Sequence, residues 1–186
     1  PDSETLVMAV LHHLPVDKEV RVLDLGTGTG CLVITLLAER ILWKGVAVDQ
    51  SFAALQMARR NAASLQVTDR LDFVQSCWGN EINQTFDLVI SNPPYIATED
   101  IAALSDDVKN FDPVEALDGG VDGLEAYRTI INGLPRLLSA GGMVCFEIGM
   151  GQADAVCAML QKGNFENILR FKDLSGIERV LLAKYR

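Results

Sequence analysis

The segment 91–96, with the sequence SNPPYI, contains the residue types that most directly suggest chemistry. Proline lacks a backbone N–H and pushes the preceding residue into an extended conformation, so Asn92 and Pro93 are both expected to be extended. The segment is therefore stiff, rich in carbonyl oxygens and poor in hydrogen-bond donors. A ligand that suits it brings N–H groups and needs acceptors.

A second chemical signature is the glycine-rich segment 23–30, LDLGTGTG, between a predicted strand and a predicted helix. Glycines there allow a ligand to approach the backbone and the helix N-terminus. The dinucleotide pattern G-x-G-x-x-G would need a third glycine at position 31, which is Cys31, whereas Gly26, Gly28 and Gly30 give G-x-G-x-G. NAD is therefore disfavoured, and the P-loop pattern ending in Gly-Lys-Ser/Thr is absent.

Asp49 ends the next predicted strand, about 20 residues after the glycine-rich segment, where a carboxylate is suited to accept two ribose hydroxyls. Taken singly, these features also fit a glycine-rich turn and a helix-capping aspartate. In open α/β sheets, however, ligands gather beyond the carboxyl ends of the strands, and Gly26, Asp49, residues 75–78 and Asn92 all fall at such ends. The combination favours a binding site over the two separate structural interpretations.

Short apolar strands that alternate with helices must position these residues. We predict strands over residues 20–26, 45–49, 71–75, 86–91 and 141–149, and helices over 31–41, 51–65, 123–138 and 151–163. Ser51 is a candidate N-cap, and residues 166–174 and 178–185 are expected to form a hairpin at one edge. This pattern predicts an α/β fold with a mainly parallel sheet buried on both faces. Residues 97–123 form one long irregular connection, typical of a lid or a binding loop.

Length and composition fit a single domain, because the chain has 186 residues and 49% of them are hydrophobic. No apolar run approaches the roughly 18 residues of a membrane span, and no signal peptide is recognisable. The net charge is −9, with 16 Lys+Arg against 25 Asp+Glu, and no basic cluster stands out. A free-standing nucleic-acid binder usually has a basic patch. The chain begins with Pro1, so we expect it to be part of a longer protein.

The cysteines and histidines do not predict a metal site or a disulfide framework. Cys31, Cys77, Cys145 and Cys157 lack CxxC spacing. His12 and His13 are adjacent, and adjacent side chains rarely share one face. We expect a reduced, cytoplasmic setting.

The glycine-rich segment, Asp49 and NPPY together resemble class I S-adenosylmethionine-dependent methyltransferases that act on a planar NH2 group. More closely, the chain is similar to the HemK/PrmC family, the release factor glutamine methyltransferases. The resemblance covers nearly the whole chain, with PDSETLV, LDLGTGTG, AVDQS, SNPPYI, FDPVEALDGGVDGLEAYR and DLSGIERVLLAKY in family order. Because DNA and RNA amino-methyltransferases share NPPY, residues 111–128 are what favours HemK/PrmC.

The resemblance implies a Rossmann-like class I methyltransferase fold that uses S-adenosyl-L-methionine and releases S-adenosyl-L-homocysteine. We expect residues 1–186 to form one methyltransferase domain, without the family's N-terminal helical domain. Asp49 would hold the ribose, Trp78 would lie against the adenine, and Asn92 would border cofactor and substrate. Cys77 stands where relatives often have an acidic residue, and a thiol is a poor acceptor for the adenine amino group. The methionine portion would be wrapped by Gly26, Thr27, Gly28, Thr29 and Gly30.

An amide nitrogen is a poor nucleophile because its lone pair is delocalised into the carbonyl, so catalysis would depend on positioning and on acceptors. The side-chain oxygen of Asn92 and the carbonyl of Pro93 are the candidate acceptors for the two N–H bonds. Pro94 stiffens the segment, and Tyr95 offers a ring on which the planar amide can pack. No strong general base is evident. Glu147 and Gln152 are interpreted as structural.

Three hypotheses follow. The first is methyl transfer to the side-chain amide nitrogen of the glutamine in the Gly-Gly-Gln motif of peptide chain release factors, with no direct nucleic-acid partner and no membrane. The second is an adenine or guanine amino-methyltransferase acting on RNA or DNA with the same loop; the acidic charge and the lack of a target-recognition module weigh against it. The third is a nucleotide-binding regulatory module, which leaves the acceptor loop unexplained.

Overall fold

The structure is a computed structural model that describes residues 2–103 and 113–186. Its centre is a seven-stranded sheet with the order β3-β2-β1-β4-β5-β7-β6. The parallel part consists of β1 (Arg21–Leu25), β2 (Lys44–Asp49), β3 (Leu71–Gln75), β4 (Phe86–Ser91) and β5 (Leu138–Glu147). β6 (Phe165–Lys172) and β7 (Glu178–Tyr185) form an antiparallel hairpin, and β7 pairs with β5. The predicted α/β fold with an antiparallel edge hairpin is confirmed.

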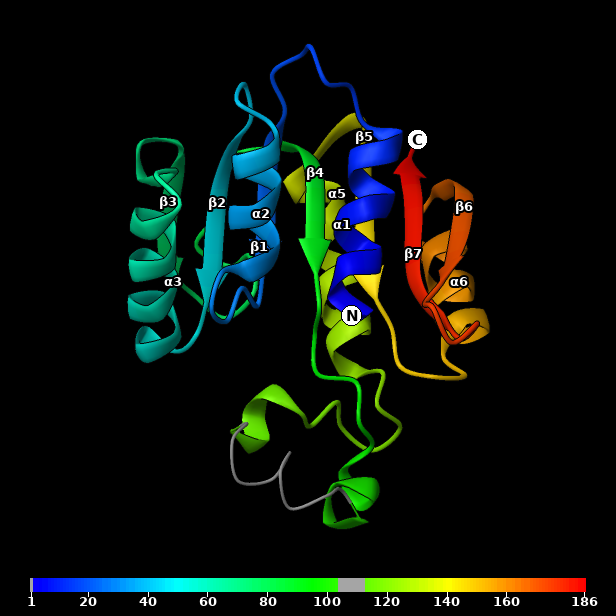
Figure 1. Cartoon of the computed structure of the whole chain (residues 1–186). Helices are drawn as coiled ribbons and strands as arrows, with labels where there is room; N and C mark the ends of the chain where they lie inside the picture. The colour runs from blue at the N-terminus through cyan, green and yellow to red at the C-terminus, as the bar shows by residue number, and fades with distance from the viewer. Residues whose placement is uncertain (1, 104–112) are drawn as a thin grey trace.

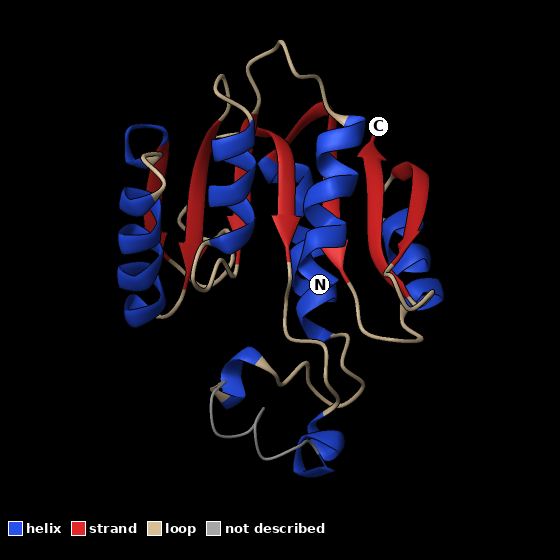
Figure 2. Ribbon diagram, viewed as in Figure 1, coloured by secondary structure: helices blue, strands red, loops and turns tan. Residues whose placement is uncertain are grey.

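Helices cover both faces of the sheet (Figures 1 and 2). α1 (Asp2–His13), α2 (Cys31–Glu39) and α3 (Phe52–Ser64) contribute to the core on one face. α5 (Glu125–Leu137) and α6 (Ala153–Lys162) contribute to the core on the other. The central strands β1, β2 and β4 are almost entirely buried, as expected for parallel strands covered on both sides.

The predicted strands and helices occur where the sequence pattern placed them, with ends that differ by up to three residues. β3 and β4 have the predicted limits. Ser51 caps α3, because its hydroxyl accepts a hydrogen bond of 3.2 Å from the backbone N–H of Ala54. Helix α1 was not predicted. Its buried face contains Leu6 and Val10, with Leu14 one further turn on, just past the end of the helix, and α1 packs against β5, β7 and α2.

The described parts of the long connection between β4 and α5, residues 92–103 and 113–124, lie beyond the carboxyl ends of the parallel strands, at the lower edge of the sheet in Figure 1. These parts contain two short 3-10 helices, η2 (Thr98–Ala103) and η3 (Val114–Ala116). A third, η1 (Thr68–Arg70), precedes β3. Phe111 and Asp112, the first two residues of the segment that favours HemK/PrmC, lie outside the described residues.

Across residues 2–103 and 113–186, no helix is long and apolar enough to cross a membrane. The same residues contain no group of three or more His, Cys, Asp or Glu side chains that could hold a metal ion.

Candidate active site

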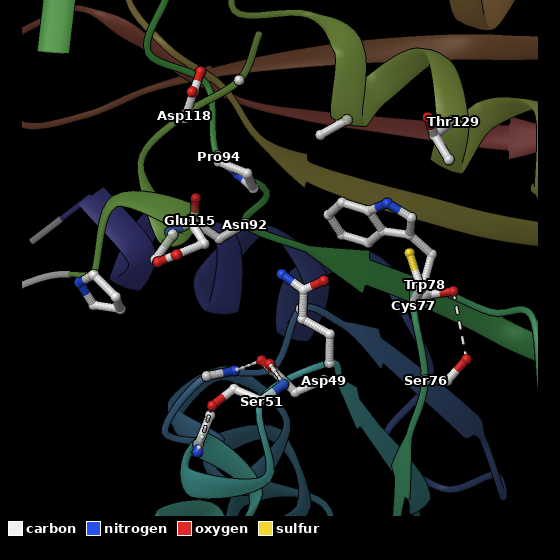
Figure 3. Close-up of a pocket in the computed structure, with 18 of the residues that line it drawn as sticks. Asp49, Ser51, Ser76, Cys77, Trp78, Asn92, Pro94, Glu115, Asp118 and Thr129 are labelled. Carbon is white, nitrogen blue, oxygen red and sulfur yellow. Dashed lines mark hydrogen bonds between the residues drawn. The ribbon is translucent and has the colours of Figure 1, made fainter. Parts of the chain in front are cut away.

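One cleft of about 770 Å³ opens at the carboxyl ends of β1, β2, β3 and β4 (Figure 3). Its volume is within the range of sites for small molecules and cofactors. The segments after these strands line it, together with η3, the turn before α5 and the start of α5. From the predicted site the lining includes Gly26, Gly28, Thr29, Asp49, Trp78, Asn92 and Pro94. Thr27, Gly30, Pro93 and Tyr95 are not among the lining residues.

The glycine loop after β1 has three left-handed residues, which explains the choice of glycine. Gly26, Gly28 and Gly30 have φ values of 71°, 55° and 80°. A Cβ atom on Gly28 would meet no atom within 4 Å, so this backbone is open to the cleft. A Cβ on Gly30 would instead lie 2.6 Å from Ile34 Cδ1 and 3.0 Å from Ala58 Cβ. Gly30 therefore permits the close contact between α2 and α3 and does not face the cleft.

Thr27 is turned into the interior. Its hydroxyl donates a hydrogen bond of 2.7 Å to Asp24 Oδ2, and both residues are buried. Asp24 Oδ1 has no hydrogen-bond partner within the described structure. Burial raises the pKa of the Asp24 carboxyl to about 7; the Thr27 hydrogen bond opposes this shift and the nearby charge of Asp49 adds to it. A carboxyl group whose pKa is raised by burial thus lies beneath the glycine loop and is bonded to it through Thr27.

Asp49 lies at the end of β2, at the bottom of the cleft in Figure 3. Its Oδ2 accepts a hydrogen bond of 2.8 Å from the backbone N–H of Gly28, and its Oδ1 accepts one of 2.8 Å from that of Ser51. These bonds orient the carboxylate, as a capping aspartate would. A carboxylate has about four acceptor positions, so two remain for a ligand.

Trp78, in the segment after β3, stands at the edge of the cleft (Figure 3). A Cβ atom on Gly26 would lie 3.3 Å from Trp78 Cζ3, so the indole lies against the glycine loop. The φ of Trp78 is 50°, which is rare for a bulky residue and marks local backbone strain. Cys77, beside it, is exposed and lines the same cleft.

The acceptor segment, residues 92–95 with the sequence NPPY, follows β4 and brings Asn92 and Pro94 to the cleft lining, while Pro93 is buried. No described residue forms a hydrogen bond with the Asn92 side chain. At the strand end, the hydroxyl of Ser91 donates a bond of 2.6 Å to the Leu25 carbonyl and ties β4 to β1. Tyr95 is partly buried and packs against the hydrophobic core.

The chain that follows the acceptor segment is held by a short backbone ladder. The N–H of Ile96 bonds to the carbonyl of Leu117 at 3.1 Å, and the N–H of Gly119 bonds back to the carbonyl of Ile96 at 2.8 Å. The N–H of Thr98 reaches the carbonyl of Gly120 at 3.0 Å. The ladder connects the acceptor segment to the turn that precedes α5.

The two residues interpreted as structural have defined partners. Glu147 is buried at the end of β5 and accepts a hydrogen bond of 2.8 Å from the Ser3 hydroxyl. The Gln152 side chain donates a bond of 2.9 Å to the carbonyl of Tyr95.

Several lining residues were not singled out from sequence. Three of them carry carboxylates, and with Asp49 they make this cleft acidic. Of the described lining residues, none is Lys, Arg or His. The available signal was that all three lie in residues 111–128, the segment FDPVEALDGGVDGLEAYR that resembles the HemK/PrmC family. The three are Glu115, Asp118 and Glu125.

The cleft fits S-adenosylmethionine better than a dinucleotide. Side-chain-free backbone at Gly26 and Gly28 allows close approach, Asp49 offers acceptors for hydroxyls, and Trp78 offers an aromatic surface. Acidic lining suits a ligand that carries a sulfonium and an ammonium group. The pyrophosphate of NAD would find no basic lining side chain among the described residues.

The arrangement of the sheet, the helices and the cleft defines a class I methyltransferase domain. The model of the methyltransferase small domain family matches residues 3–107, and the chain belongs to this family. Both the family and the fold imply use of S-adenosylmethionine.

Known relatives confirm the resemblance to the HemK/PrmC family. The chain is 45% identical over 186 residues to a release factor glutamine methyltransferase of Rhodospirillum rubrum, covering 100% of this chain and 57% of that protein. It is 42% identical over 184 residues to the enzyme of the same name from Cereibacter sphaeroides, covering 99% of this chain and 65% of the relative. The chain thus spans less than two thirds of the length of these relatives.

A solved structure of a protein with a similar name also resembles this chain. The protein-(glutamine-N5) methyltransferase, release factor-specific, from Alicyclobacillus acidocaldarius superposes with a TM-score of 0.61 at 25% identity. The match covers 100% of this chain and 93% of that one.

Proposed function

We propose that this chain transfers a methyl group from S-adenosyl-L-methionine to the side-chain amide nitrogen of the glutamine in the Gly-Gly-Gln motif of peptide chain release factors. The observation that supports this most directly is that Gly28, Asp49 and Asn92 line one cleft. A cofactor held by the first two would lie beside an acceptor-rich segment. The names of the relatives supply the substrate class.

The cofactor would be held by the strand ends β1 to β4. We assign the methionine portion to the loop from Gly26 to Gly30, in which Thr29 lines the cleft and Thr27 supports the loop from beneath. Asp49 would accept the ribose hydroxyls, and Trp78 would flank the adenine. When bound, S-adenosylmethionine supplies a methyl group that the positive charge of its sulfonium already activates.

The acceptor segment would orient the substrate amide. The side-chain oxygen of Asn92 and the backbone carbonyl of Pro93 would each accept one N–H bond and aim the nitrogen into the cleft. Their partial negative charges would stabilise the nitrogen as it becomes cationic in the transition state. Pro94 keeps the segment stiff, and the partly buried Tyr95 ring, which packs against the core and does not line the cleft, would anchor the end of the segment. Positioning of this kind can supply much of the rate.

The acidic cleft favours a protein substrate over a nucleic acid. A phosphate backbone is normally held by Lys and Arg, and the described lining carries carboxylates instead. We therefore infer no direct nucleic-acid partner, and a release factor substrate would place the reaction in the cytoplasm. We also propose that residues 1–186 act as one methyltransferase domain.

The test is incubation with methyl-labelled cofactor and a release factor, with a matched release factor whose Gly-Gly-Gln glutamine is replaced by alanine. We expect mass spectrometry to find one added methyl on that glutamine and none on the alanine control. Methylation of adenine in RNA or DNA, with the release factor untouched, would move the assignment to nucleic-acid amino groups.

A further inference from the structure

The amide of Gln152, at the start of α6, joins three separate segments of the chain. Its Nε2 donates hydrogen bonds to the carbonyl of Tyr95 at 2.9 Å and to the carbonyl of Gly123 at 3.2 Å. Its Oε1 accepts a bond of 3.0 Å from the backbone N–H of Gly149. The partners fix the orientation of the amide, because the flipped form would place an oxygen against two carbonyls.

Three glycines leave room for the Gln152 amide and for the backbone segments that it joins. A Cβ atom on Gly123 would lie 2.4 Å from the Tyr95 carbonyl oxygen and 2.8 Å from Gln152 Nε2. A Cβ atom on Gly149 would lie 2.8 Å from Gln152 Oε1 and 3.0 Å from Tyr95 Cδ2. On Gly119, it would lie 2.8 Å from the carbonyl oxygen of Pro94. Backbone and the Gln152 amide therefore enclose the end of the acceptor segment.

Gln152 supplies a hydrogen-bond donor to the acceptor segment, which is poor in donors of its own. Pro93 and Pro94 have no N–H groups, so these two residues can be fixed only through carbonyls and packing. The Tyr95 carbonyl, held by Gln152, comes next in the chain. Asn92 lies three residues before Tyr95. No described residue forms a hydrogen bond with the Asn92 side chain, so the backbone sets its position.

We propose that Gln152 is a positioning residue for methyl transfer, which holds the Tyr95 carbonyl and through it the acceptors of Asn92 and Pro93. This inference rests on the proposed function of that segment. Catalytic groups must be held to within about 0.5 Å, and a displacement of about 1 Å can reduce a rate about 100-fold. Gln152 does not line the cleft, and its hydrogen-bond partners Tyr95, Gly123 and Gly149 do not line it either, so its effect should fall on turnover.

The variant Gln152→Glu keeps the shape of the side chain but replaces the donor with an acceptor facing two carbonyls. Gln161→Glu, at an exposed position on the same helix, makes the same change of charge and is the matched control. We expect kcat for the release factor to fall about 10- to 100-fold in Gln152→Glu, with the Kd for S-adenosylhomocysteine within about twofold of the parent. The control should match the parent in both values. A parental kcat in Gln152→Glu, or a parallel loss of cofactor affinity, would overturn the assignment.

Hydrogen–deuterium exchange tests the positioning without any turnover. In Gln152→Glu we expect about tenfold faster exchange at the amides of Ile96 and Thr98, which bond into the ladder after the acceptor segment. The amide of Val156, which bonds to the Gln152 carbonyl in α6, should be unchanged. Unchanged exchange at the first two amides, or equal acceleration at Val156, would mean that Gln152 only stabilises its helix. If the parent protein modifies no glutamine, the proposed function fails, and the exchange result still decides whether Gln152 holds this segment.

Discussion

The backbone N–H of Gly28 donates a hydrogen bond of 2.8 Å to the carboxylate of Asp49, 21 residues later in the chain. The bond joins the glycine loop after β1 to the end of β2, so the two parts of the proposed cofactor site are fixed relative to each other. The N–H of Ser51 holds the second carboxylate oxygen at 2.8 Å. Asp49 is therefore both an organiser of the loop and a source of acceptors for a ligand.

Replacing Asp49 with alanine should weaken cofactor binding by about 10- to 100-fold. The change removes charged hydrogen bonds to the ribose, worth about 1.5–3 kcal/mol, and leaves the Gly28 N–H without its acceptor. Asp72→Ala, which removes an exposed carboxylate from the neighbouring strand β3, is the matched control. Calorimetric titration with S-adenosylhomocysteine measures both. Equal affinity in the parent and Asp49→Ala would reject the ribose role.

Replacing Asn92 with alanine should lower turnover by about 100-fold or more, because it removes an acceptor that acts in the transition state. Thermal stability should change little, since no described residue bonds to the Asn92 side chain. Cofactor affinity should stay within a few-fold of the parent. The measurement is the single-turnover rate of methyl transfer to a release factor, with the exposed Asn83→Ala as control. A rate within a few-fold of the parent would show that the acceptor mechanism is wrong.

Asp24 gives a prediction about pH. Burial raises the pKa of its carboxyl from 3.8 to about 7 in the folded chain. The folded state thus holds the proton more tightly than the unfolded state, so this contribution to stability is complete below about pH 4 and is lost as pH rises through 7. At about 1.4 kcal/mol per pKa unit, a shift from 3.8 to about 7 corresponds to a loss on the order of 4 kcal/mol.

Asp24→Asn should remove that part of the pH dependence, because an amide does not ionise. Urea unfolding between pH 4 and pH 8 should show a smaller decline in the free energy of unfolding than in the parent. Its side-chain oxygen can still accept the Thr27 hydroxyl, which limits other changes. Identical pH profiles for the two proteins would show that the Asp24 carboxyl does not titrate in this range.

The sheet was predictable from the sequence because parallel strands buried on both faces appear as short apolar runs, as in the FDLVI of β4. Parallel strands end at the same edge of a sheet. The ends of β1, β2 and β4 could therefore be placed at one edge, which brought Gly26, Asp49 and Asn92 together. Helix α1 was not predicted, because the likeness of residues 1–7 to a family segment does not by itself indicate a helix. Its buried leucine and valine positions were visible as a helical repeat.

Side-chain direction within the loops could not be predicted. Thr27 and Thr29 are equivalent in the pattern G-T-G-T-G, yet one bonds to buried Asp24 and the other lines the cleft. The backbone conformation of the glycines decides between these outcomes, and the local sequence does not reveal it. Likewise, Glu115 lines the cleft from η3 and Glu125 lines it from the start of α5, and no local sequence pattern reveals that these elements meet the strand ends.

Gly28 and Gly30 provide the last prediction, because the same substitution should have different effects at the two positions. Both residues are left-handed, so alanine at either should be strained by about 1–2 kcal/mol. At Gly28 the added methyl would project into open space in the cleft and exclude the cofactor, so affinity should fall at least tenfold. At Gly30 it would press on Ile34 and Ala58 between two helices, adding about 1–3 kcal/mol of destabilisation from overpacking. Denaturant unfolding and calorimetric titration of both variants separate the effects. Gly28→Ala should be the weaker binder and Gly30→Ala the less stable protein, and the reverse order would contradict the separate roles given to these glycines.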